Sequence, residues 1–340
     1  MLRMRPFEVV RPTTVEAAVA ALIQHGPGAV PIAGGTDLLP NLKHELLGPS
    51  HLVALGGIPE LFGISRGADG GLRIGAMTPL DEIAASELVR GEAAVLAQAA
   101  GLVAGPQLRR MGTLGGNVML DTRCQWYNQT YFWRSALGFC MKKDGTVCHV
   151  VKGGSKCVAA ASNDSAPALT VLGAELEFAG PAGSRRVPIQ ELWRADGIHN
   201  KKVESGEILV AAHLPPQPKG RRSAYGKLRE RGSIDYPLFG VAVRFDLDPR
   251  GAFSDVQGAV VALAARPLEL KGLAELFAGL SPEHPDFEAA VEAAGQAAYK
   301  QCHPLANIPG DAAYRRRMVP VYVKRTLRAA ARGQGPVHHV

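Results

Sequence analysis

The sequence predicts an α+β protein of two or three compact domains. Three observations lead to this prediction. Strand-like and helical segments alternate in the first part of the chain, a proline-rich linker follows at 215–220, and strands precede helices after the linker. With 340 residues and 46% hydrophobic content, the chain can form more than one apolar core.

The first expected unit covers residues 1–56 and has a strand–turn–helix pattern. Thr13-x-x-Glu16 is a capping-box pattern that precedes an alanine-rich helical run ending at His25-Gly26. We expect strands at 29–33 and 52–55 and a second helix after the turn that begins at Gly34.

The second expected unit covers residues 57–214 and is interrupted by a cysteine-rich insertion at 122–158. The third covers residues 222–332. In the second unit we expect strands at 72–76, 175–178 and 208–213, a helix starting near 78, a long helix at 92–104, and a segment at 166–172. In the third we expect strands at 224–228, 239–245 and 259–264, then amphipathic helices at 268–280, 287–299 and 312–331.

Charge and hydropathy restrict the classes of function. No apolar run is long enough to span a membrane, so we expect a protein that does not enter membranes and is cytoplasmic. The net charge is +7, but the basic residues mix with acidic ones except at 219–231 and 315–328. This pattern does not predict nucleic-acid binding. A solvated face, a subunit contact and a docking site for an acidic protein remain open for the two basic tracts.

Four of the five cysteines lie within the insertion, with the spacing C-x15-C-x7-C-x8-C. The odd cysteine count and the absence of an apolar run that could act as a secretory signal argue against disulfides. Soft thiolate ligands favour zinc or an iron–sulfur cluster, and the aromatic residues between the first two cysteines would exclude water from a cluster. Spacing alone leaves a cluster, zinc and unliganded thiols open. The candidate metal ligands are Cys124, Cys140, Cys148 and Cys157.

Two glycine-rich loops, Gly34-Gly35-Thr36 and 112–117, are candidate anion sites. Backbone N–H groups at such loops bind phosphate oxygens. Neither loop matches the G-x-G-x-x-G or G-x-x-x-x-G-K-[ST] pattern, so a Rossmann unit and an NTPase are not predicted. Each loop could be an ordinary turn, but two loops in separate units could clamp one dinucleotide between them.

These loops and their flanks resemble the two FAD signatures of the flavoprotein subunits of the xanthine oxidase family of molybdenum hydroxylases. The similar segments are 31–38 followed by Lys43, and 105–117. The resemblance implies a two-part FAD-binding domain of the PCMH-like type, a C-terminal α+β domain and a cysteine-rich loop insertion. The implied FAD-binding residues are Pro31, Ile32, Ala33, Gly34, Gly35, Thr36, Asp37, Leu38, Thr113, Gly115, Gly116 and Asn117.

Three further matches extend the resemblance over nearly the whole chain. Asp164 lies in a segment similar to the one whose aspartate reaches the ribityl or ribose part of FAD, and Lys227 matches a lysine that approaches the FAD. The pair Tyr314-Arg315 matches the start of the family's C-terminal helix.

The insertion resembles that of the β subunit of 4-hydroxybenzoyl-CoA reductases, in which four cysteines hold a [4Fe–4S] cluster. A related insertion with different cysteine spacing occurs in bacterial molybdenum aldehyde oxidoreductases. The resemblance therefore implies a [4Fe–4S] cluster on the four cysteines of the insertion.

The resemblance also implies a function in electron transfer. The expected partners are a large molybdenum-cofactor subunit and a small subunit with two [2Fe–2S] clusters, in an (αβγ)2 heterohexamer. Substrate chemistry would occur on the molybdenum subunit, so we expect no catalytic residue in this chain. Reduced ferredoxin would supply electrons through the [4Fe–4S] cluster and FAD for the reductive dehydroxylation of 4-hydroxybenzoyl-CoA, a step of aromatic degradation. The alternative is a subunit of an aldehyde- or N-heterocycle-oxidising enzyme.

Overall fold

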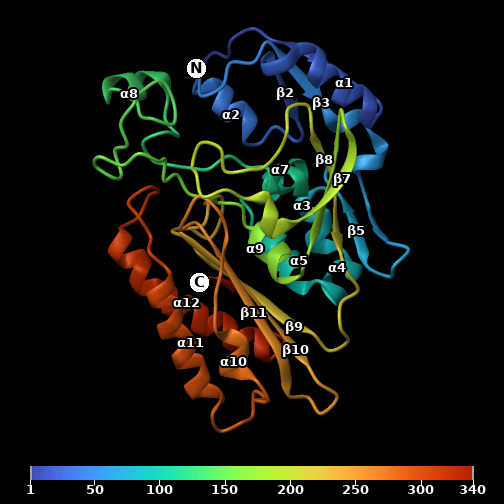
Figure 1. Ribbon diagram of the computed structural model, residues 1–340, viewed down its shortest axis with the longest axis vertical. Coiled ribbons are helices and arrows are strands. Elements are labelled where there is room, and N and C mark those ends of the chain that lie inside the picture. Colours follow the sequence, from blue (N-terminus) through green and yellow to red (C-terminus); the bar gives the residue numbers. More distant parts are fainter. Residues whose placement is uncertain (1, 339–340) are drawn as a thin grey trace.

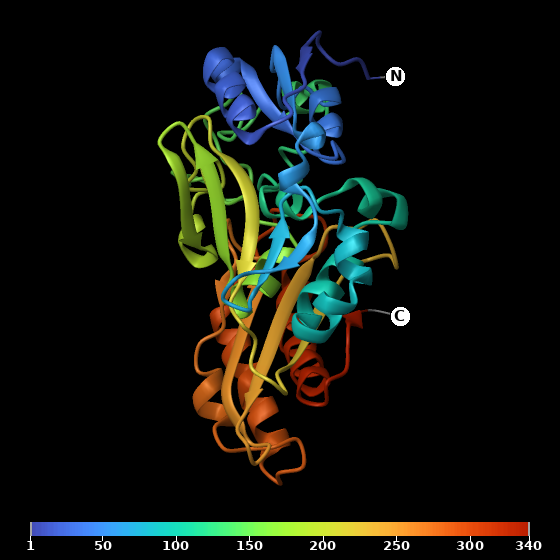
Figure 2. The ribbon, with the colours of Figure 1, turned by 90° about the vertical axis from the view of Figure 1, so that its right-hand side faces the viewer.

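The computed structural model describes residues 2–338, which form three sheets arranged along the long axis of the molecule (Figure 1). Figure 2 shows the same order from the side, with the N-terminal sheet at one end and the C-terminal sheet at the other. The strand orders are β1-β3-β2, β4-β5-β8-β6-β7 and β12-β11-β10-β9-β13. Within the described part of the chain, no helix combines the length and apolarity needed to cross a membrane.

The N-terminal sheet is parallel, and its strands are joined through helices. The first helix is capped by Thr14, whose Oγ1 accepts a hydrogen bond from Ala17 N at 3.2 Å. The expected cap at Thr13 was therefore wrong by one position. The expected strand 29–33 is confirmed, whereas the three-residue strand β1 was not expected. The elements are β1 (Glu8–Val10), α1 (Val15–His25), β2 (Ala29–Ile32), α2 (Leu38–Lys43) and β3 (His51–Ala54).

The central sheet is antiparallel, and short helices cover it. The long helix expected at 92–104 is shortened at both ends to 94–101, because Ala93 adopts φ −135° and ψ 47° before its first residue and Ala104 has φ +44° beyond its last. The strands are β4 (Ile64–Arg66), β5 (Leu72–Gly75), β6 (Glu175–Gly180), β7 (Gly183–Pro188) and β8 (Ile208–Leu214). The helices are α3 (Leu80–Ala85), α4 (Glu87–Glu92), α5 (Ala94–Gly101), α6 (Pro106–Met111), α7 (Leu114–Val118), α8 (Tyr131–Ala136) and α9 (Ser165–Val171).

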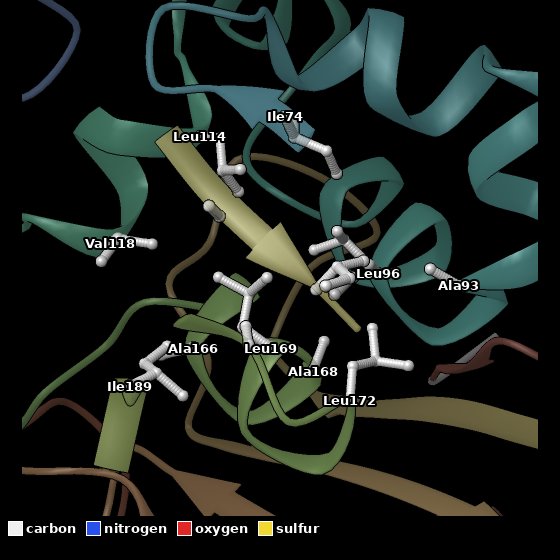
Figure 3. Close-up of a cluster of buried hydrophobic side chains, with 14 of the residues drawn as sticks. Ile74, Ala93, Leu96, Leu114, Val118, Ala166, Ala168, Leu169, Leu172 and Ile189 are labelled. Carbon is white, nitrogen blue, oxygen red and sulfur yellow. The ribbon is translucent and has the colours of Figure 1, made fainter. Parts of the chain in front are cut away.

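The central core lies where α5, α7 and α9 meet. Figure 3 shows Leu96 of α5, Leu114 of α7 and Leu169 of α9 pointing toward one another, with Ile74 of β5 beside them. All four side chains are buried. This packing fixes α7, and with it the second glycine loop, relative to the central sheet.

The C-terminal sheet has two buried faces. Tyr225, Ala242 and Ala259 are cross-strand neighbours and belong to the central core. Val241 and Val260 point the other way, because side chains alternate along a strand, and they pack in the core that contains α11 and α12. The elements are β9 (Arg222–Leu228), β10 (Phe239–Leu247), β11 (Phe253–Val261), β12 (Leu268–Glu269), α10 (Leu273–Phe277), α11 (Phe287–Gln301), α12 (Ala312–Ala331) and β13 (Val337–His338).

Most of the expected elements of this region are confirmed, with two exceptions. The strand expected at 259–264 instead begins at Phe253 and ends at Val261. The helix expected at 268–280 is reduced to α10, because Leu268 and Glu269 pair with β11 and Gly272 adopts φ +83°. Backbone pairing with a neighbouring strand satisfies groups that a longer helix would have satisfied internally.

Several of the cationic side chains in the two basic tracts, 219–231 and 315–328, bind acceptors within the protein. Arg315 is fully buried and donates to the carbonyl oxygens of Leu238 (2.9 Å), Leu305 (2.8 Å) and Ala262. Farther along α12, Arg328 forms ion pairs with two glutamates of α11. In the other tract the partners are also internal: Arg221 binds Asp246, Lys227 binds Asp164 and Arg231 binds Asp235. These cations mainly hold the C-terminal region together.

Replacement of Arg315 by Met should reduce the free energy of unfolding by about 3 kcal/mol, because three buried carbonyl oxygens lose their donor. Denaturant unfolding of the variant measures this loss. Arg317→Met, on the exposed side of the same helix turn, is the matched control and should be nearly neutral. Equal effects of the two substitutions would show that the buried contacts of Arg315 do not stabilise the fold.

Candidate functional site

A cavity of about 560 Å3 opens between the N-terminal and central sheets. Its volume is in the range of small-molecule and cofactor sites. Five segments contribute to its wall: the loop after β2, the α6–α7 loop, the start of the cysteine segment, the residue before α9, and the loop between β9 and β10. The lining residues used below are Gly34, Gly35, Asp37, Thr113, Gly116, Arg123, Tyr127, Asp164, Ile234 and Tyr236.

The first glycine loop presents open backbone donors. Gly35 has φ +71°, a conformation that glycine adopts without steric cost. Among the described residues, no protein acceptor is found for the N–H groups of 34–38, whereas the next N–H, that of Leu39, bonds to Gly35 O at 3.0 Å. A run of open N–H groups beside a cavity is suited to binding an anion.

The second glycine loop is held more tightly by the protein itself. Thr113 caps α7, with its Oγ1 accepting from Gly116 N at 3.0 Å. The N–H of Gly115 donates to Ala76 O at 2.7 Å, and that of Leu114 to Thr78 O at 3.0 Å. The N–H groups of Gly112 and Asn117 also have acceptors, Leu108 O at 2.6 Å and Thr113 O at 2.9 Å, so the expectation of open donors along 112–117 is wrong for all but Thr113. The loop lines the cavity as a rigid wall because its backbone is pinned to the end of β5.

The two loops meet at Gly34. A Cβ atom at this position would overlap the backbone carbonyl of Met111 and lie 3.2 Å from Gly112 N. Backbone atoms cannot move aside as a flexible side chain can, so only glycine permits this approach. Gly115 has a similar constraint, because its Cβ would lie 2.8 Å from both Ala76 Cβ and Ala76 O.

Asp37 connects three segments at the rim of the cavity. Its Oδ1 accepts from Arg123 Nη1 at 3.2 Å and from the Tyr236 hydroxyl at 3.0 Å, and its Oδ2 accepts from Asn41 Nδ2 at 2.8 Å. The Arg123 guanidinium also lies 3.8 Å from the centre of the Tyr236 ring, a cation–π contact. These contacts tie the first loop to the cysteine segment and to the β9–β10 loop.

Asp164 forms a buried ion pair behind the cavity. Its Oδ2 accepts from Lys227 Nζ at 3.0 Å and its Oδ1 from the Tyr225 hydroxyl at 2.8 Å. Lys227 Nζ donates further to Leu102 O at 2.9 Å. Burial raises the pKa of Asp164 and lowers the pKa of Lys227, and the charge of each residue opposes the shift of the other.

The structure brings together all but two of the residues predicted to bind a cofactor. Ile32 and Lys227 do not line the cavity; Lys227 reaches it only through Asp164. Tyr236, Ile234 and Tyr127 line the cavity but were not predicted. They lie in loops without a sequence motif, and only their tertiary neighbours place them there.

The two ends of the cysteine segment are paired at Arg123 and Ala160, which together form its neck. Arg123 and Ala160 exchange two backbone hydrogen bonds of 2.8 Å each, so the segment leaves and re-enters the fold at nearly the same point. Outside the neck, buried Arg134 donates to Glu45 O at 3.0 Å, which holds α8 against the N-terminal region (Figure 1). Asn307 Nδ2 donates to Val158 O at 2.6 Å on the other side.

The four cysteines of the segment are free thiols that lie near one another. Cys124, Cys140 and Cys157 are buried in one apolar cluster with Tyr127 and Leu46, and Cys148 is partly buried. Burial raises the pKa of Cys124 to about 11, and the nearby Cys157 and Cys140 contribute to this rise. The pKa of Cys157 is also raised, mainly by burial, with Cys140 and Cys148 among the contributing charges.

The donor chemistry and the proximity of these thiols fit a soft metal centre. However, residues 2–338 contain no group of three or more His, Cys, Asp or Glu side chains arranged to hold a metal ion. The four expected cysteine ligands thus lie near one another, but their side chains are not arranged around a common metal position. Metal binding and local folding are coupled in such sites, because the assembled ligand set rarely exists before the metal binds.

Replacement of Gly34 by Ala should greatly reduce the flavin content of the purified protein, because the new methyl group would force the two loops apart. Flavin absorbance per chain measures the effect. Gly91→Ala is the control, since a Cβ at Gly91 meets nothing within 4 Å and this site on α4 is exposed. Full flavin content in Gly34→Ala would contradict the proposed role of the close approach.

Asp164→Asn and Lys227→Met should each lower the free energy of unfolding by about 3–5 kcal/mol, because each leaves a buried charge without its partner. The double variant should lose much less than the sum. Thermal and denaturant unfolding provide the measurement. Glu292→Gln, which breaks the more exposed pairs of Glu292 with Lys324 and Arg328, should cost less than about 1 kcal/mol. Additive losses at Asp164 and Lys227 would mean that the two charges do not depend on each other.

Comparison with known proteins agrees with this geometry. Residues 5–217 match the family described as the FAD binding domain in molybdopterin dehydrogenase, and residues 223–330 match the CO dehydrogenase flavoprotein C-terminal domain. The chain is 36% identical to the aldehyde oxidoreductase FAD-binding subunit PaoB of Escherichia coli (strain K12), over 73% of this chain and 80% of that protein. It is 31% identical to the carbon monoxide dehydrogenase medium chain of Hydrogenophaga pseudoflava, over 95% and 96% of the two chains.

Solved structures show the same relationship. The carbon monoxide dehydrogenase of Hydrogenophaga pseudoflava, in a form lacking the Mo-pyranopterin moiety, superposes with a TM-score of 0.78 at 29% identity and covers 98% of this chain and 100% of its own. The expected α+β architecture, with an FAD-binding part and a C-terminal domain, is confirmed by these matches. The cavity, its glycine walls and these similarities lead to one conclusion: the chain belongs to the FAD-binding subunits of the xanthine oxidase family of molybdenum hydroxylases.

Proposed function

We propose that this chain is the FAD-binding electron-transfer subunit of an aldehyde-oxidising molybdenum hydroxylase, and that its cysteine segment holds a [4Fe–4S] cluster. The main observation in support is that one residue contacts both sites: Tyr127 lines the cavity and also packs against three of the four cysteines. The similarity to an aldehyde oxidoreductase FAD-binding subunit supports the class of enzyme.

FAD would lie in the cavity between the two glycine loops. The open N–H groups of 34–38 suit its diphosphate, and the pinned wall at Thr113, Gly115, Gly116 and Asn117 faces them. Asp164, held by Lys227, offers a fixed carboxylate to a sugar hydroxyl group. When bound, FAD supplies hydride and one-electron chemistry. The role of the chain is to orient the cofactor and keep water from it.

The four cysteines of the segment would be the cluster ligands. Thiolate ligands, an apolar shell and exclusion of solvent are the properties that set the potential of such a centre. The shell here includes Trp126, Met141 and Val150, which pack against the buried thiols. The segment is added at the neck formed by Arg123 and Ala160, so it can carry an additional centre without altering the fold around the cavity.

Substrate chemistry would take place on a separate large molybdenum subunit. A small subunit with two [2Fe–2S] clusters would carry electrons between that subunit and this chain. Ferredoxin is the proposed external electron carrier.

A second candidate function is the reduction of 4-hydroxybenzoyl-CoA, which is favoured by the cysteine spacing of the insertion. The relatives favour the oxidising enzyme. An assay of the purified complex with aromatic aldehydes and with 4-hydroxybenzoyl-CoA distinguishes the two; activity with 4-hydroxybenzoyl-CoA alone would overturn the main proposal.

Replacement of Cys140 or Cys148 by Ser should remove about four irons per chain from the complex and abolish the [4Fe–4S] signal, because a serine oxygen is a poor ligand for a soft metal. Elemental analysis and electron paramagnetic resonance measure this loss, and flavin content should persist. Cys302→Ala is the control, since this thiol is buried in the C-terminal core away from the segment. One zinc and no iron in the wild-type chain would overturn the cluster.

A further inference from the structure

A lysine ammonium is buried beside the cysteine segment. Lys142 follows Cys140 by two positions, and its side chain is only 3% exposed. Its Nζ donates to Asp121 Oδ1 at 2.9 Å, to Thr122 Oγ1 at 2.7 Å and to Gly197 O at 2.6 Å. An ammonium group has three donors, so all of them are satisfied. This charge is held in one place by the fold.

The group that holds the ammonium also contacts a cysteine. The N–H of Gly197 donates to Cys157 O at 2.9 Å, and a Cβ on Gly197 would lie 2.7 Å from Cys157 Sγ. On its other side, Lys142 Nζ lies 4.7 Å from the centre of the Tyr127 ring. Lys142 is therefore located between the thiols and the wall of the cavity.

A second lysine lies close to Lys142. Lys201 is partly buried, and its Nζ donates to Leu120 O at 2.6 Å and to Asn200 Oδ1 at 3.0 Å. The charges of Lys142 and Asp121 both act on Lys201. The Asp121 carboxylate is 44% exposed and the Lys142 side chain 3% exposed, so water screens the carboxylate more than the ammonium group.

We propose that Lys142 is a positioning residue that raises the reduction potential of the centre held by Cys124, Cys140, Cys148 and Cys157. The inference rests on the proposed cluster. Adding an electron makes a thiolate-bound cluster more negative, and a nearby buried cation stabilises that state more than the oxidised one. The same ammonium joins the cysteine segment to the loop that contains Gly197.

The test is a redox titration of the cluster, followed by electron paramagnetic resonance in the intact complex. Lys142→Met removes the charge but keeps most of the length. It should change the ratio of reduced to oxidised cluster at a fixed potential about tenfold, which corresponds to a midpoint about 59 mV lower. Lys142→Arg keeps the charge and should stay close to the wild type. Lys143→Met is the matched control, because this neighbouring lysine is 39% exposed and pairs with Asp144 at the surface.

The possible outcomes separate the two proposals. Wild-type protein without iron would overturn the proposed cluster and this inference with it. A full iron content in Lys142→Met with an unchanged midpoint would overturn the inference alone, as would an equal shift in Lys143→Met. Should Lys142→Met fail to retain iron, Lys142→Gln, which also removes the charge, decides: a midpoint about 59 mV below that of the wild type supports the role of the charge, and an unchanged midpoint overturns it.

Discussion

The close approach of two backbones at Gly34 is the constraint on which the site depends. The loop after β2 belongs to the N-terminal sheet and the loop before α7 to the central sheet, and they touch where a side chain would overlap the Met111 carbonyl. This contact sets the distance between the open donors of the first loop and the pinned wall of the second. The cavity therefore has a defined width before any cofactor enters.

The cysteine segment is an addition to the fold around the cavity. Its ends meet at the paired backbone groups of Arg123 and Ala160, so the surrounding elements need not move. The same Arg123 reaches Asp37 and stacks on Tyr236 at the cavity rim. The neck is thus both the attachment point of the segment and part of the cavity rim.

Several lysine and arginine side chains of this protein bind acceptors within the fold. The sequence left a solvated face, a subunit contact and a docking site open for the basic tracts, yet Arg315 binds backbone carbonyls and Lys227 pairs with Asp164. Lys142 is a further case, since it lies in a polar loop but is almost fully buried. A net charge of +7 therefore says little about partners, because many of these cations have internal acceptors.

The sequence by itself determined the family, both glycine loops, the four-cysteine segment and the longer C-terminal helices, because these depend on local patterns of residue type and spacing. Only the tertiary structure decided the break at Ala93, the short strand at Leu268 and the position of Tyr236 at the cavity. The Tyr236 hydroxyl bonds to Asp37 across most of the chain. Such contacts arise from how sheets pack on one another, and no local pattern in the sequence encodes them.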